Sequence, residues 1–278
     1  TLHAPSRLPV LKYADSRAVR EKMYKGYINL ASQAPYDNRP IIGEIVKLRA
    51  RKAAILGYKD FASYMTDNVM AKTPEAATDL LMKIWTPAVN RAKEEIVEMT
   101  DYARGEGQNI TIEPWDYYYY AEKVRAKKFD LDENEVSAYF ALDNVRKGIF
   151  TLAEKLYGVK FTEMPDAPKY NPEVTVYDVT DAKSSEHVAV FMTDYFPRAT
   201  KRQGAWMDEL RGSFADADGT VQRPIVYNVG NFTRPAGDTP ALLTVDEVET
   251  MFHEFGHGLH GMLRRARLRS QSGTNTDR

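Results

Sequence analysis

Two histidines and a glutamate near the end of the sequence have the spacing of a catalytic metal site. The five residues from His253 to His257 read HEFGH, which fits the pattern HExxH. Residues four positions apart lie on the same face of a helix, so the two imidazoles can bind one metal ion at about 2.0–2.1 Å. Glu254 lies beside the metal without binding it, where it can take a proton from a water molecule. We therefore expect a Zn²⁺ site with His253 and His257 as ligands and Glu254 as the general base.

A catalytic zinc ion is usually held by three protein ligands, so this site needs one more. Beyond His257, the only carboxylate in the sequence is Asp277. Either Asp277 completes the site or the third ligand lies outside the 278 residues. His260 is one turn further along the same face. This position favours a role next to a zinc ligand or next to the substrate over a role as a ligand. The alternatives are a metal site without catalysis and a helix whose histidines bind no metal.

The helix that carries the histidines has clear local signals. Thr244 can cap its amino end, and Glu247 three residues later completes a capping box. Spacings of three, four and three residues then predict an apolar stripe that anchors the helix in a core, formed by Phe252, Phe255, Leu259 and Met262.

The pattern of the sequence before this helix changes after Pro165. Helical periodicity and capping signals predict helices over residues 13–35, 40–57, 60–71, 73–105 and 112–161, the last with a break near 130–132. Alternating apolar and polar residues then predict strands over 173–181, 187–196 and 223–232, the first two forming a hairpin. The predicted fold is mainly α-helical with a small antiparallel β-sheet. The predicted domains are a helical region over 1–170 and, over 171–278, the sheet with the histidine helix.

Composition excludes several classes of protein. The formal net charge is −1, so no overall field favours nucleic acid or an anionic membrane surface. No apolar run approaches the roughly 18 residues that a membrane-spanning helix needs. There is no cysteine, which excludes disulfides and thiolate metal ligands. We expect no nucleic-acid or membrane partner and a cytoplasmic location, with the periplasm as the alternative.

Several segments resemble one family of zinc metallopeptidases: thimet oligopeptidase, neurolysin, oligopeptidase A and the bacterial peptidyl-dipeptidases. The segment most similar to the metal-binding helix of that family is LLTVDEVETMFHEFGHGLHGML. Further likenesses are EPWDYYYYAEKVR, DYFPRATKRQGAW and RPIVYNVGNFTRP. The ending SGTNTDR is most similar to the peptidyl-dipeptidase branch.

The resemblance implies a zincin-like metallopeptidase that admits short peptides to a deep channel. It assigns His253 and His257 to zinc and Glu254 to the general base, and it implies a third ligand, a glutamate, just beyond the SGT segment. The sequence would then be a piece of a longer enzyme, with the C-terminal part and its ligand missing. On this interpretation the isolated chain has little or no activity.

The expected reaction is release of C-terminal dipeptides from short peptides, and internal cleavage of oligopeptides is the alternative. A metal-binding helical fragment without turnover is the alternative that is not an enzyme. Zinc and Glu254 would activate a water molecule for attack on the peptide carbonyl. An exposed strand edge at Tyr227–Asn231 is expected to hold the substrate main chain in an extended form.

Overall fold

The computed structural model describes residues 2–129, 133–235, 237–268, 270 and 273–274. Its contacts divide the chain into two compact units that meet in the sequence at residues 130–131. The predicted helix break near 130–132 lies outside the described residues. The predicted domain boundary between residues 170 and 171 follows from a change in sequence pattern and stays a prediction.

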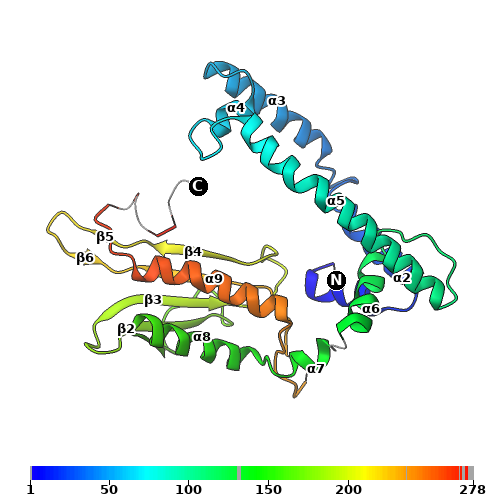
Figure 1. The fold of residues 1–278 in the computed structure, drawn as a ribbon. Helices are drawn as coiled ribbons and strands as arrows, with labels where there is room; N and C mark the ends of the chain where they lie inside the picture. Colours follow the sequence, from blue (N-terminus) through cyan, green and yellow to red (C-terminus); the bar gives the residue numbers. More distant parts are fainter. Residues whose placement is uncertain (1, 130–132, 236, 269, 271–272, 275–278) are drawn as a thin grey trace. The chain divides into compact units, whose positions relative to one another are not determined.

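The first unit is built from helices (Figure 1). Its described helices are α1 (Ala4–Tyr13), α2 (Arg17–Ile28), α3 (Arg39–Ile55), α4 (Phe61–Thr66), α5 (Pro74–Gly105) and α6 (Tyr117–Phe129). α5 begins where the sequence signals place it, because Thr73 Oγ1 accepts a hydrogen bond from the Ala76 N–H at 3.1 Å. α1 is absent from the sequence-based prediction because Pro5 and Pro9 interrupt its helical pattern.

A buried ion pair ties α2 to the residue that precedes α6. Asp116 is 0% exposed and Arg20 is 2% exposed. Arg20 Nη2 donates to Asp116 Oδ1 at 2.8 Å, and Arg17 Nη2 donates to Asp116 Oδ2 at 2.7 Å. Burial raises the pKa of Asp116, but the hydrogen bonds from the two arginines outweigh burial and hold that pKa below its ordinary value of 3.8. The carboxylate is therefore ionised inside the unit.

Asp116→Ala is expected to lower the free energy of unfolding of the first unit by about 3–5 kcal/mol, because it leaves the Arg20 guanidinium buried without its charged partner. The measurement is chemical denaturation followed by tryptophan fluorescence, since Trp85 and Trp115 both lie in this unit. The difference between variant and wild type should shrink as the pH falls below 3.8. A carboxyl group whose pKa is lowered by folding stabilises the folded state only while it is ionised.

A matched control for this prediction is Asp101→Ala in the same unit. Asp101 belongs to an ion pair with Arg104 on the surface of α5, where the side chain of Asp101 is 61% exposed. Exposed pairs of this kind contribute little to stability. Equal effects of the two substitutions on unfolding would contradict the role given to the buried pair.

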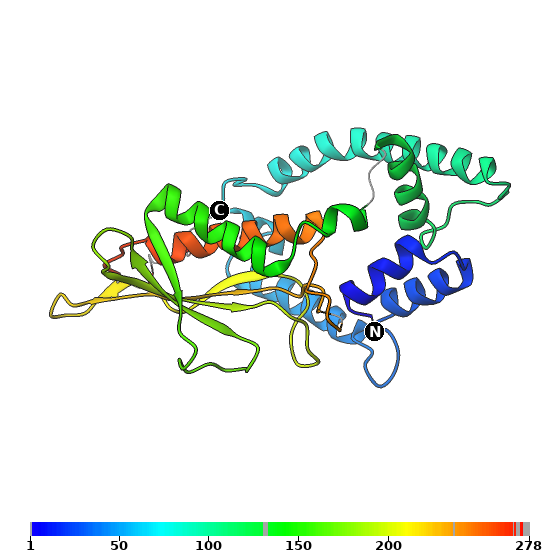
Figure 2. The same ribbon diagram turned by 90° about the horizontal axis from the view of Figure 1, so that it is seen from below.

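The second unit is a five-stranded sheet covered on one face by two helices. Its described helices are α7 (Glu133–Ser137), α8 (Leu142–Tyr157) and α9 (Val245–Leu263). Its strands are β1 (Val159–Glu163), β2 (Thr175–Asp181), β3 (His187–Asp194), β4 (Trp206–Arg211) and β7 (Ile225–Val229), with a separate pair of β5 (Phe214–Ala215) and β6 (Val221–Gln222). The order in the large sheet is β1-β2-β3-β7-β4. Figures 1 and 2 show α8 and α9 side by side on the same face of this sheet.

The sheet differs from the prediction in the direction of one pairing. The pair β2–β3 is antiparallel, as predicted, and the unpredicted strands β1 and β4 also pair antiparallel with β2 and β7, whereas β3 and β7 are parallel, with Met192 opposite Tyr227. The chain leaves β3, forms β4 at the edge of the sheet, and returns as β7 between the two. β7 is then antiparallel to β4 and must be parallel to β3, so the sheet is mixed.

The end of α8 corrects the predicted helix over 112–161. α8 ends at Tyr157, and Gly158 follows with a left-handed φ of 67°, a conformation that suits glycine. Its N–H donates to the Glu154 carbonyl at 2.9 Å. The residues after Gly158 form β1, which pairs with β2. The sheet therefore begins earlier in the sequence than predicted.

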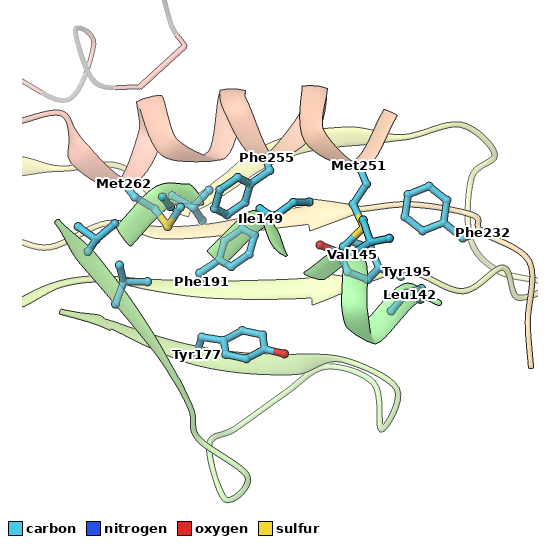
Figure 3. Close-up of a cluster of buried hydrophobic side chains, with 14 of the residues drawn as sticks. Leu142, Val145, Ile149, Tyr177, Phe191, Tyr195, Phe232, Met251, Phe255 and Met262 are labelled. Atoms are coloured by element: carbon cyan, nitrogen blue, oxygen red, sulfur yellow. The ribbon is translucent and has the colours of Figure 1, made fainter. Parts of the chain in front are cut away.

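The core of the second unit lies between the sheet and helices α8 and α9 (Figure 3). From α9, Met251, Phe255 and Met262 point into this core, and each is at most 4% exposed. Leu259 packs against the core while partly exposed, but Phe252, which was predicted to join the stripe, is 39% exposed. The buried stripe therefore starts at Met251, one residue earlier than predicted, and it leaves the opposite side of α9 to the histidines.

Candidate metal centre

The histidine pair lies on α9, whose amino end is fixed by the predicted capping box. Thr244 Oγ1 accepts a hydrogen bond from the Glu247 N–H at 3.2 Å, and the Glu247 carboxylate accepts one from the Thr244 N–H at 3.0 Å. The same carboxylate accepts a bond from the Thr233 N–H at 3.2 Å, which ties the loop after β7 to the helix. Burial raises the pKa of Glu247, and these hydrogen bonds lower it by less.

His253 and His257 turn their rings toward each other on α9. Their Nε2 atoms are 3.1 Å apart, and their ring centroids are 4.8 Å apart with an interplanar angle of 85°. Two nitrogens that each bind one tetrahedral zinc ion at 2.0–2.1 Å lie about 3.3 Å from one another. The observed separation is therefore close to the one that a zinc ion shared by the two imidazoles would impose.

Glu254 follows His253 directly on α9. Its side chain is half-buried, while that of His253 is exposed and that of His257 is half-buried. Glu254 and His257 are three residues apart on one helix, so they are neighbours on its surface. Sequence spacing thus places the Glu254 carboxylate near His257 on the helix, while the Nε2 atoms of His253 and His257 face each other.

The described residues bring two candidate ligands together and no complete set. Among the described residues, no group of three or more His, Cys, Asp and Glu side chains could hold a metal ion. Asp277, the candidate third ligand in this sequence, lies outside the described residues. His260 is exposed near the end of α9, and its role beside a ligand or the substrate stays a prediction.

In the part of the chain that the structure describes, the edge strand of the sheet next to α9 is β4. β7 pairs with β3 on one side and with β4 on the other. The predicted exposed edge at Tyr227–Asn231 is therefore wrong. Asn231 instead donates from Nδ2 to the carbonyl oxygens of Arg202 at 3.1 Å and Gly204 at 2.6 Å. These bonds fasten the loop that leads into β4 to the end of β7.

A buried ionic cluster, which sequence reasoning missed, also holds this loop. Asp194 Oδ1 accepts hydrogen bonds from Arg198 at 2.8 Å and from Lys201 Nζ at 2.9 Å. Lys201 is 8% exposed, and its Nζ also donates to the Phe196 carbonyl at 2.8 Å. Burial raises the pKa of Asp194, but the two cations outweigh burial and lower it. The only signal in the sequence is the close spacing of one aspartate with two cations.

Glycine 261 brings α9 directly onto β4. A Cβ atom placed on Gly261 would lie 2.6 Å from Met207 Cε and 2.8 Å from Glu209 Oε1, and both contacts are too close for a side chain at this position. Glu209 Oε1 is buried and has no hydrogen-bond partner among the described residues. Burial raises the pKa of Glu209, and the nearby Arg264 lowers it by less. The half of α9 that follows His257 therefore rests on the edge strand.

Comparison with known proteins decides the family. Residues 10–278 match peptidase family M3. This chain belongs to peptidase family M3. It is 40% identical over 274 residues to a dipeptidyl carboxypeptidase of Escherichia coli (strain K12), an alignment that covers 97% of the chain and 39% of that relative.

Two further M3 relatives carry the name oligopeptidase A. The oligopeptidase A of Salmonella typhimurium (strain LT2) is 37% identical over 278 residues, with 98% of the chain and 41% of the relative covered. An organellar oligopeptidase A of Arabidopsis thaliana, described as chloroplastic/mitochondrial, is 39% identical over 270 residues, with 95% of the chain and 34% of the relative covered. The chain thus spans between about one third and two fifths of the length of these relatives.

Membership of the M3 family confirms the resemblance seen in the sequence. It also confirms the predicted class, a zincin-like metallopeptidase fold that is mainly helical with a small sheet and of which the chain covers a part. The names of the relatives include both dipeptide release and oligopeptide cleavage, so they leave the choice between these two activities open. No helix in the described parts of the chain is both long and apolar enough to cross a membrane.

Proposed function

We propose that this chain supplies two zinc ligands and the general base of an M3 peptidase that hydrolyses short peptides. The observation that carries the proposal is the 3.1 Å separation of the His253 and His257 Nε2 atoms on one helix, where Glu254 follows His253 in the sequence. Membership of the M3 family supports a metallopeptidase. His253 and His257 are two imidazole side chains of this chain that lie close enough together to bind one metal ion. A complete centre needs a further protein ligand in addition to these two.

The roles of the three residues follow from their chemistry. His253 and His257 hold the ion through Nε2. A bound zinc ion polarises a peptide carbonyl and lowers the pKa of water toward about 7. Glu254 accepts the proton of the attacking water and then donates it to the leaving amine. This needs a carboxylate close to the ligands but outside their donor set, as the neighbouring position of Glu254 on the helix provides.

The substrate would lie along β4 in place of the rejected edge at β7. β4 is the last strand of the sheet on this side, and α9 packs against it at Gly261. An extended peptide can add to such an edge through main-chain hydrogen bonds, with little dependence on its side chains. The buried cluster around Asp194 would keep the loop before this strand in place.

We favour release of C-terminal dipeptides over internal cleavage. The E. coli relative is a dipeptidyl carboxypeptidase, and the ending SGTNTDR resembles the peptidyl-dipeptidase branch. The discriminating assay uses one quenched peptide with a free C-terminus and the same peptide amidated. An M3 enzyme containing this chain should cleave the free form and leave the amidated form intact. Equal cleavage of both forms would instead indicate an oligopeptidase.

The direct test of the proposed site is the zinc content of the purified chain. We expect one zinc ion per chain by elemental analysis after incubation with zinc and desalting, together with little or no turnover. A chain that takes up no zinc would contradict the metal centre proposed on His253 and His257. Turnover comparable to that of a full-length relative would contradict the need for a further ligand.

A further inference from the structure

The interface between α9 and the sheet contains a polar side chain that has no partner. Asn228 on β7 is 1% exposed, and neither its Nδ2 nor its Oδ1 atom has a hydrogen-bond partner among the described residues. Its neighbours are Thr193, which lies opposite it on β3 and is 2% exposed, Met207 opposite it on β4, and the ring of Phe191. Buried polar groups are nearly always hydrogen-bonded, so an unpaired carboxamide at this place requires an explanation.

The carboxamide of Asn228 lies directly beneath the helix turn that carries His257. A Cβ atom placed on Gly258 would lie 3.1 Å from Asn228 Oδ1 and 3.5 Å from the ring of Phe191. Glycine at position 258 therefore lets the carboxamide approach the backbone of α9 immediately after His257. In a helix, each carbonyl oxygen keeps a second lone pair that can accept another hydrogen bond.

A leucine in place of Asn228 would have almost the same shape and no unpaired atoms. Packing alone would therefore favour leucine at this position, because an unpaired buried donor or acceptor destabilises the folded state. Buried polar groups of this kind typically bind an ordered water molecule. Since leucine at position 228 would favour the folded state at least as much, we attribute the side-chain amide of Asn228 to a contact with a purpose other than stability.

We propose that Asn228 is a positioning residue for the histidine pair. Its carboxamide binds one buried water molecule, which hydrogen-bonds to the backbone of α9 at the turn that ends in His257. This contact holds the turn at the height over the sheet where both Nε2 atoms reach the same ion. Asn228 is not itself a ligand, and the proposal rests on the proposed function only in that the pair binds zinc.

The test compares Asn228→Leu with Val226→Ala in the whole chain. Val226 lies two residues earlier on the same strand, is 0% exposed, and contacts α9 at Gly261. Two quantities are measured: the affinity for Zn²⁺, by competition with a chromophoric chelator, and the melting temperature of the metal-free chain. Asn228→Leu should weaken zinc binding by about 10- to 100-fold, the range found when residues that orient metal ligands are replaced. Its melting temperature should stay the same or rise.

Val226→Ala should show the opposite pattern, because it opens a cavity without touching the carboxamide. Its melting temperature should fall and its zinc affinity should stay within about twofold of wild type. Asn228→Ala, which adds no bulk, is the second variant and should weaken zinc binding like Asn228→Leu. Unchanged zinc affinity in both Asn228 variants would overturn the proposal, and so would a loss of affinity that merely follows a loss of stability. Failure of the wild-type chain to bind zinc would instead remove the proposed function.

Discussion

Replacing His253 or His257 by alanine is expected to lower the affinity of the chain for Zn²⁺ by more than about 100-fold. Loss of a residue that only orients a ligand weakens metal binding by about 10- to 100-fold, so loss of a ligand should exceed that range. Each substitution leaves a single imidazole where the two Nε2 atoms now lie 3.1 Å apart. The measurement is a zinc titration of each variant in competition with a chelator.

The matched control for the two histidines is His260→Ala. His260 lies on the same helix and is exposed, but it is outside the pair whose rings face each other. Its replacement should leave zinc affinity within about threefold of wild type. All three variants should keep the melting temperature of the metal-free chain, because none of these side chains belongs to the buried core. Equal loss of zinc in His253→Ala and His260→Ala would show that the histidines bind metal without a defined site.

Local signals explain why α9 could be predicted from the sequence. The capping box of Thr244 and Glu247 acts over three residues, and the histidine spacing needs only the geometry of one helix turn. The exposed Phe252 shows the limit of this reasoning, because a stripe of apolar residues fits a helix in more than one rotation. Which rotation is correct depends on the neighbouring sheet.

Non-local contacts explain what the sequence did not predict. The ion pair of Arg20 and Asp116 joins residues that are 96 positions apart, and no local pattern links them. β3 and β7 are parallel because the chain first forms β4 at the edge of the sheet and then returns as β7 between β3 and β4. No local pattern in the sequence fixes this order of strands. Asn228 falls within the strand predicted over 223–232, and no pattern in the sequence shows that its side chain lies under Gly258.

Glu254→Gln is expected to lower kcat for a quenched peptide by roughly 10²- to 10⁴-fold in an active M3 peptidase that contains this chain, the range that general acid–base catalysis contributes. Glutamine keeps the size of the side chain but cannot accept the proton of water. The value of KM should change little, because the carboxylate acts on the reacting water and not on substrate binding. Steady-state kinetics and zinc analysis of the same preparation provide the measurement.

Zinc content decides what a loss of turnover in Glu254→Gln means. The variant should retain its zinc, since the Nε2 atoms of His253 and His257 face each other without a contribution from Glu254. Glu249→Gln on the same helix is the matched control: its carboxylate is exposed one turn before the site, and both kcat and zinc content should stay near wild type. If Glu254→Gln loses zinc and activity together, the carboxylate holds the metal centre in place. If the variant keeps both its zinc and its activity, another residue transfers the proton, and the HExxH helix contributes only metal ligands to the enzyme.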